Sequence, residues 1–120
     1  MALKIDVDSG KPGVARLMLG GSLDSQTAPQ LESALGTVDA AIPLIVLDLK
    51  ELAFISSAGL RVIFAALKRQ EAKGGEILMT NMSAGVRKVF EIVRALPKMN
   101  VFASEREMDE YLATFQKHKN

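Results

Sequence analysis

The sequence predicts an α/β protein with one mixed, mainly parallel β-sheet of about four to five strands, about four packed helices and an N-terminal antiparallel hairpin. Residues 44–49 form a continuous apolar run of the length expected for a central strand covered on both faces. After a short loop, residues 60–67 place their apolar side chains on one helical face. An alternating N-terminal segment precedes this unit, and further strand and helix patterns follow it.

Size and charge limit the kind of protein. The chain has 120 residues, of which 48% are hydrophobic and 24% charged, so residues 1–120 fit one globular domain with residues 116–120 as a polar, flexible tail. The 15 basic and 14 acidic residues leave a net charge of +1. Because no basic stripe is interleaved with aromatic residues, a nucleic-acid partner is not expected.

Cysteine usage and hydropathy indicate the compartment. The chain contains no cysteine, which excludes disulfides, thiolate zinc sites and cysteine nucleophiles and is compatible with a reducing compartment. Residues 1–8 lack the apolar core and cleavage site of a signal peptide, and no apolar stretch approaches the roughly 18 residues of a membrane span. We therefore expect a free-standing cytoplasmic domain without membrane insertion.

The N-terminal segment predicts a hairpin. Leu3, Ile5 and Val7 alternate with polar residues, which is the period of a half-buried edge strand. Residues 8–13 collect turn formers, after which Ala15, Leu17 and Leu19 resume the alternation until Gly20 and Gly21 end it. A polar loop, residues 22–26, comes next. Thr27 and Gln30 then have the spacing of a capping box, and a helix follows with Ala28, Leu31, Leu35 and Val38 on its apolar face and fraying near Gly36.

The C-terminal half continues the alternation of strands and helices. Gly74 and Gly75 predict a left-handed helix end, and residues 76–80 a further strand. Ser83 is a candidate N-cap for a helix that Pro97 closes, and residues 101–102 are a candidate short strand. Ser104 and Glu107 have capping-box spacing ahead of a last helix, whose apolar face carries Met108, Tyr111, Leu112 and Phe115.

The loop between the apolar run and its helix holds two serines and a glycine. Ser56 and Ser57 lie where a helix start offers free backbone N–H groups and a positive dipole end, so an anion would be tolerated there. The alternative interpretation is structural: one serine is a cap, and Gly59 only lets the loop approach the strand closely.

Catalytic patterns are missing from the sequence. The single histidine, His118, lies in the tail between two lysines, so no serine has an imidazole base from the folded part of the chain. There is no P-loop, no Gly-x-Gly-x-x-Gly after a strand, and no cluster with metal-ligand spacing. Asp48 does not indicate a phosphorylated aspartate, because no acidic pair follows the first strand to hold magnesium. We expect a protein that is not an enzyme and needs no cofactor or metal.

One motif resembles a known family. It follows the central strand and reads Asp48-Leu-x-x-Leu52-x-Phe54-Ile55-Ser56-Ser57-Ala58-Gly59-Leu60. This resembles the signature of the STAS family, the domain shared by sulfate transporters and bacterial anti-sigma factor antagonists, and residues 21–24, 74–76 and 83–90 resemble other parts of it. By this resemblance, Ser57 falls on the residue that a partner anti-sigma factor, an ATP-dependent serine kinase, phosphorylates. Family members commonly carry Asp at the position of Ser56. Ser56 itself is our second choice of phosphate acceptor.

The resemblance implies a STAS-like fold and an anti-sigma factor antagonist that works by partner switching. The unmodified protein would capture the anti-sigma kinase, the form phosphorylated on Ser57 would release it, and a serine phosphatase would reset the cycle. An alternative is a STAS subunit of a membrane lipid-transport complex that docks constitutively on the transporter ATPase. A further alternative is the cytoplasmic part of a sulfate-type transporter, but the absence of a membrane segment argues against it. The oligomeric state stays open between a monomer and a weak dimer.

The partner-binding surface is expected around Ser57. In open α/β sheets the loops at the carboxyl ends of strands converge on one rim, which would bring Asp24 and Ser25 close to Ser57. We therefore expect one exposed face that includes Asp24, Ser56, Ser57, Gly59, Leu60 and Arg61. The expected partner-binding residues are these six together with Ser25 and Ala58. The structural alternative is that Asp24 merely caps the first helix.

Overall fold

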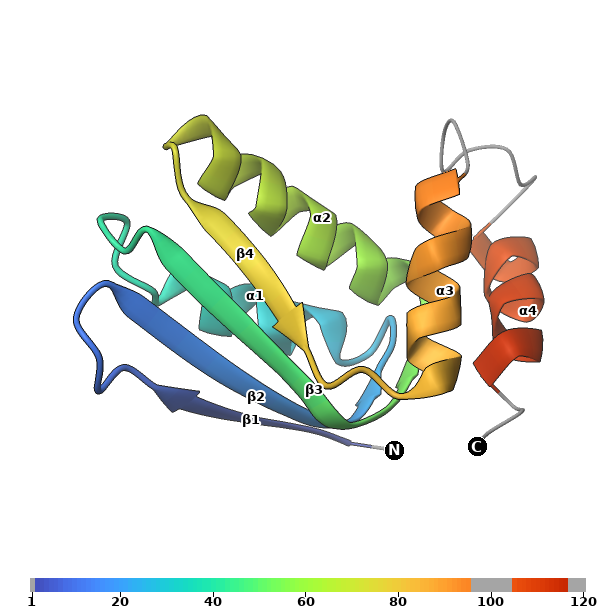
Figure 1. Ribbon diagram of the computed structural model, residues 1–120. Coiled ribbons are helices and arrows are strands. Elements are labelled where there is room, and N and C mark those ends of the chain that lie inside the picture. The colour runs from blue at the N-terminus through green and yellow to red at the C-terminus, as the bar shows by residue number, and fades with distance from the viewer. Residues whose placement is uncertain (1, 96–104, 117–120) are drawn as a thin grey trace.

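The computed structural model describes residues 2–95 and 105–116, and this part of the chain forms a four-stranded mixed sheet with four helices (Figure 1). The strands lie in the order β1-β2-β3-β4, with β1 antiparallel to β2 and the other neighbours parallel. This confirms the predicted fold class, the hairpin and the edge position of the first strand. The elements are β1 (Leu3–Asp8), β2 (Val14–Leu23), α1 (Ala28–Gly36), β3 (Leu44–Ile55), α2 (Ser57–Ala72), β4 (Glu76–Thr80), α3 (Ala84–Ala95) and α4 (Glu105–Gln116).

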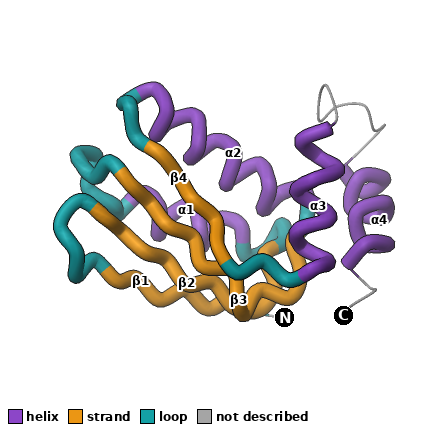
Figure 2. The backbone as a smooth tube through the Cα atoms, viewed as in Figure 1, coloured by secondary structure: helices purple, strands orange, loops and turns teal. Residues whose placement is uncertain are grey.

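The helices are distributed unevenly over the sheet. α1 and α2 cover one face, whereas α3 and α4 lie side by side beyond the end at which β3 and β4 finish (Figures 1 and 2). The core lies between the sheet and these helices, and its fully buried side chains include Leu17, Leu31, Leu47, Leu49, Leu60, Ile63 and Leu112. No helix in the described residues is long and apolar enough to cross a membrane.

β3 is the central strand, as its apolar sequence predicts. It pairs with β2 on one side and with β4 on the other, so that Leu47 lies between Leu17 and Met79 and is completely buried. The strand is longer than predicted, because it continues past Leu49 to Ile55 and pairs there with the end of β2.

The prediction that Gly20 and Gly21 end the second strand is wrong. β2 continues to Leu23, and its pairing with β3 shifts on either side of these glycines. Gly21 has a φ of 96°, and a Cβ there would lie 2.1 Å from the carbonyl oxygen of Ala2, so only glycine fits. The two glycines therefore form an irregularity within the strand and not a turn after it.

Two predicted helix ends are confirmed. Gly74 has a φ of 81° just after α2, and the Gly75 amide donates to the Gln70 carbonyl oxygen at 2.8 Å, as a left-handed helix end requires. At the start of α3, the Ser83 hydroxyl accepts a hydrogen bond from the Val86 amide at 3.3 Å.

The last helix differs in part from its prediction. Gln116 is not the start of a tail, because it is the last residue of α4. Leu112 is completely buried as predicted, whereas the neighbouring Tyr111 is 45% exposed because successive residues lie about 100° apart around a helix. Four predicted features fall outside the described residues: the stop at Pro97, the strand at 101–102, the cap at Ser104 and the tail at 117–120 with His118.

Asp48 lies on the sheet face opposite α1 and α2 and is largely buried. Burial raises the pKa of its carboxyl group, but three hydrogen-bond donors outweigh this effect and hold the pKa below its ordinary value of 3.8. They are the Lys50 amide at 3.1 Å, the Asn81 side chain at 3.2 Å and the Arg16 guanidinium. The carboxylate therefore joins β2, β3 and the loop after β4.

The first turn of α2 packs directly on the end of β2. A Cβ at Gly59 would lie 2.5 Å from Cγ of Leu23 and 3.1 Å from its carbonyl oxygen, and Leu23 is itself completely buried. This confirms that Gly59 allows a close approach to a strand, since only a residue without a side chain fits there, but the strand is β2 and not the preceding β3.

We predict that stabilisation by Asp48 depends on pH. A carboxyl group whose pKa is lower in the folded state stabilises the protein above its unfolded-state pKa, near pH 4, and this stabilisation is lost as the pH falls through the folded-state pKa. Asp48→Asn should therefore lower the free energy of urea unfolding near pH 7, and the deficit should shrink toward pH 3. Asp6→Asn, at an exposed carboxylate, is the control and should change little. A deficit that is constant over this range would contradict the assignment.

We also predict opposite effects for alanine at two glycines. Gly59→Ala should lower the free energy of unfolding by about 1–3 kcal/mol, because the new methyl group meets buried Leu23. Gly36→Ala should be neutral or stabilising by up to about 1 kcal/mol, since nothing lies within 4 Å of its Cβ position at the end of α1. Chemical denaturation of both variants tests this. Equal changes in the free energy of unfolding of the two variants would show that the close contact with Leu23 does not exclude a side chain at position 59.

Candidate functional site

The site lies where the paired ends of β2 and β3 lead into helices. The parallel ladder ends at Leu23 and Ile55, which are partners, and Asp24 and Ser56 follow them directly. The Ser56 amide donates to the Leu23 carbonyl oxygen at 2.8 Å, so the start of α2 is tied to the end of β2. As the geometry of an open sheet predicts, the loop that holds Asp24 and the loop that holds Ser56 meet at one rim.

Ser56 and Ser57 form the start of α2. Ser56 is the N-cap, with extended backbone angles, and its carbonyl oxygen accepts the Leu60 amide at 3.0 Å. Neither serine hydroxyl has a hydrogen-bond partner in the described residues, although both are buried. The expected cap bond from a serine side chain is therefore not formed. Two hydroxyl groups lie instead without polar contacts at a helix N-terminus.

Side chains of helix α4 form the hydrogen bonds to backbone groups at the start of α2 that the serine side chains do not form. The Ser57 amide donates to a carboxylate oxygen of Asp109 at 2.7 Å. The Gln116 side chain accepts from the Ile55 amide at 2.6 Å and donates to the Ile55 carbonyl oxygen at 2.9 Å. One helix thus satisfies free backbone groups on both sides of Ser56.

The surface around Ser57 differs from the one that the sequence predicts. Ser56 is 4% exposed, Ser57 and Leu60 are completely buried and Gly59 is buried, so the expectation that these residues share an exposed face is wrong. The other predicted residues reach solvent: Ser25 and Arg61 are exposed, and Asp24 and Ala58 are partly exposed.

Asp24 has a structural role. Its carboxylate accepts the amides of Gln26 at 2.9 Å and Thr27 at 3.1 Å, which closes the turn into α1. The Thr27 hydroxyl accepts a hydrogen bond from the Asp24 amide at 2.9 Å and donates one to the Ser22 carbonyl oxygen. The Gln30 side-chain amide donates to the Leu3 carbonyl oxygen. The predicted capping box is not formed, because the side chains of Thr27 and Gln30 make these hydrogen bonds and do not bond each other's backbone amides. The structural interpretation of Asp24 is supported.

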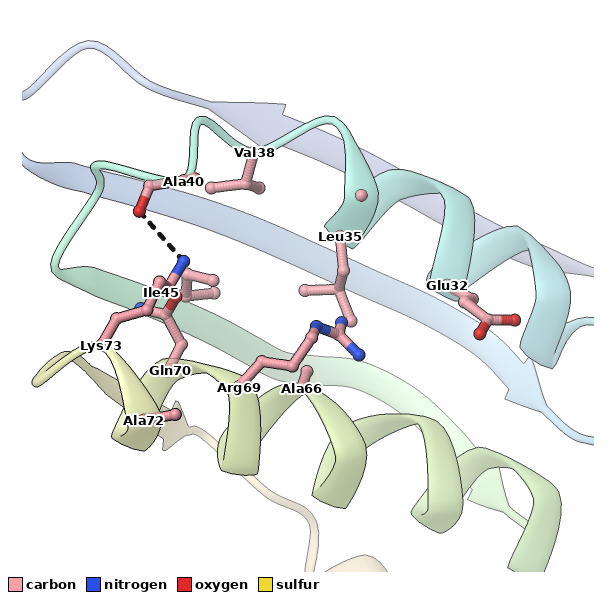
Figure 3. A pocket seen from close by; sticks show the side chains of 11 residues that line it. Glu32, Leu35, Val38, Ala40, Ile45, Ala66, Arg69, Gln70, Ala72 and Lys73 are labelled. Atoms are coloured by element: carbon pink, nitrogen blue, oxygen red, sulfur yellow. Dashed lines mark hydrogen bonds between the residues drawn. The ribbon is translucent and has the colours of Figure 1, made fainter.

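A hollow of about 600 Å³ lies between α1 and the C-terminal half of α2, away from Ser57, and none of the predicted site residues lines it (Figure 3). Its wall includes Ile45 and Arg69, and Lys73 crosses it to the Ala40 carbonyl oxygen at 3.0 Å. No group of three or more His, Cys, Asp or Glu side chains that could hold a metal ion occurs within residues 2–95 and 105–116.

Sequence reasoning missed the roles of Asp109 and Gln116. The only signal was periodicity: both lie on the same face of the last helix as Leu112, at spacings of three and four residues. Periodicity shows that a face is buried, but it does not show which part of the chain that face covers.

Comparisons with known proteins agree with this fold. Over 81 residues the chain is 41% identical to BtrV of Bordetella bronchiseptica, a candidate anti-sigma factor antagonist, and the match covers 67% of this chain and 70% of BtrV. Over 68 residues it is 40% identical to the anti-sigma-F factor antagonist RsfB of Mycobacterium tuberculosis, which covers 54% of this chain and only 56% of RsfB.

A solved structure and a family model extend the likeness to most of the chain. The anti-sigma factor antagonist SpoIIAA in its unphosphorylated form superimposes with a TM-score of 0.64 at 23% identity, over 92% of this chain and 98% of SpoIIAA, which supports the fold. The model of the STAS domain matches residues 8–108. The chain therefore belongs to the STAS domain family.

Proposed function

We propose that this protein is a cytoplasmic anti-sigma factor antagonist that works by partner switching. The observation that carries the proposal is Ser57: it begins α2 at the acceptor position of the STAS signature, and its hydroxyl has no hydrogen-bond partner in the described residues. The names of the relatives BtrV and RsfB support the same role. Unmodified, the protein binds an anti-sigma factor of the serine-kinase type. Phosphorylated on Ser57, it releases that partner, and a serine phosphatase resets it.

Electrostatics explains why binding changes and the fold survives. A phosphoryl group adds roughly −1.5 to −2 charges. The first turn of α2 contains no acidic residue of its own, so its dipole and its amides, once the Ser57 amide is released from Asp109, offset part of this charge, by about 1 kcal/mol. A partner pressed on the same surface must desolvate the phosphate, which costs several kcal/mol, whereas about 1.4 kcal/mol already weakens binding tenfold.

The partner contacts the rim around Ser57. The residues that we assign to this surface are Asp24, Ser25, Ser56, Ser57, Ala58, Gly59, Leu60 and Arg61. Ser25, Ala58 and Arg61 reach solvent and contact the partner directly. Gly59 and Leu60 are buried and act by holding the first turn of α2 in place. In this mechanism the protein itself is a kinase substrate and a binding module, with no catalytic residue.

One observation favours a second candidate function. The Ser57 side chain is completely buried, which suits a STAS subunit that docks constitutively on the ATPase of a membrane lipid-transport complex and is never modified. The two candidates differ in whether Ser57 receives phosphate from the partner.

We predict that Ser57 is the acceptor. With the partner kinase and ATP, Ser57→Ala should abolish phosphate incorporation and keep binding, because its hydroxyl makes no hydrogen bond and its loss should leave the melting temperature nearly unchanged. Ser56→Ala is the matched control, since it removes the other buried hydroxyl and should still be phosphorylated. Mass spectrometry of the modified peptide decides between them.

Two outcomes would contradict the proposal. Phosphate on Ser56 would move the acceptor by one residue. A kinase that binds the protein but modifies neither serine would replace the switch with constitutive docking.

A further inference from the structure

We infer that α4 is an autoinhibitory cover for Ser57, so that docking of α4 and phosphorylation of Ser57 exclude each other. The inference rests on the proposed function, because it takes Ser57 as the acceptor. The Asp109 carboxylate accepts a hydrogen bond from the Ser57 amide at 2.7 Å, and the Ser57 side chain is completely buried.

The inner face of α4 matches the junction that it covers. Asp109, Leu112 and Gln116 are spaced by three and four residues and therefore lie on one side of the helix. Asp109 and Gln116 bond the backbone of Ser57 and Ile55, and Leu112 between them is completely buried. Two polar side chains thus hold α4 at the end of β3 and the start of α2, with α3 beside it (Figure 2).

Asp109 occupies the place that a phosphate would seek. The first amides of a helix are free donors at the positive end of the dipole, and an anion is favoured there. In the docked state the Asp109 carboxylate supplies that anion and takes the Ser57 amide. A phosphoryl group on Ser57 would bring a second anion to the same donors, directly beside Asp109. The two like charges repel each other, so the phosphorylated form is expected to release α4.

Docking of α4 hinders phosphorylation of Ser57, and phosphate on Ser57 hinders docking of α4. While α4 is docked, the Ser57 hydroxyl is sealed from solvent and a kinase cannot align it with ATP. Any event that lifts α4, including binding of the kinase itself, raises the rate of modification. Phosphate on Ser57 then keeps α4 away, so that a partner meets a changed surface in addition to a new charge.

A single introduced thiol tests the cover without a kinase. The chain contains no cysteine, so Ser57→Cys places one reporter at the covered position. Labelling by a maleimide should be slow in this variant. It should become at least about tenfold faster when Asp109→Ala is added, because a charged hydrogen bond that holds α4 is lost.

The control lies next to Asp109 on the same helix. Glu110 points to solvent and pairs with Arg106, so Glu110→Ala in the Ser57→Cys background should leave labelling unchanged. Should Asp109→Ala impair folding, Gln116→Ala removes the second polar contact of α4 and carries the same expectation. Labelling that is equally fast in all variants, or equally slow, would overturn the cover.

The kinase assay then separates this inference from the proposed function. With Ser57 intact, Asp109→Ala should be phosphorylated at least about tenfold faster than the parent and Glu110→Ala at the parental rate. Phosphorylation of Ser57 at equal rates in all three proteins would overturn the cover and keep the switch. No phosphate on Ser57 even where the thiol reporter shows that α4 is lifted would instead overturn the switch.

Discussion

The contact between the end of β2 and the first turn of α2 determines the geometry of the rest of this structure. Leu23 and Ile55 close the parallel ladder, the Ser56 amide bonds the Leu23 carbonyl oxygen, and Gly59 lets α2 pass within reach of the Leu23 side chain. A larger residue at Gly59 would force the helix away from the sheet and move both serines with it. The position of the candidate acceptor is therefore a consequence of strand pairing and of one missing side chain, not of loop chemistry.

That junction concentrates free backbone donors at a helix N-terminus, and the chain can satisfy them in more than one way. In the described structure neither serine hydroxyl is used, and α4 supplies a carboxylate and an amide side chain instead. The same donors suit a phosphate. The proposed switch needs no pocket, metal or base, because a phosphate on Ser57 and the Asp109 carboxylate would compete for the same donors at the start of α2. This is consistent with membership of a family whose named relatives include anti-sigma factor antagonists.

The sequence was sufficient for features that depend on local chemistry and on periodicity. The apolar run from Leu44 predicts the central strand, Gly74 the end of α2, and Gly59 a close approach to a strand, and all three are confirmed. Features that depend on distant pairing could not be predicted. Gly20 and Gly21 resemble a turn, yet pairing with β3 carries β2 through them. The acceptor of the Ser57 amide is Asp109, a residue more than fifty positions later whose polar character gives no sign of its partner.

In the function proposed above, a phosphoryl group on Ser57 switches partner binding. The most direct measurement is the affinity of the kinase-type anti-sigma factor for the unmodified and the stoichiometrically phosphorylated protein, compared by isothermal titration calorimetry. Because a buried, unmatched phosphate costs several kcal/mol, we predict that phosphorylation weakens binding by at least about a hundredfold, while the melting temperature of the free protein changes little. Equal affinity of the two forms would contradict it.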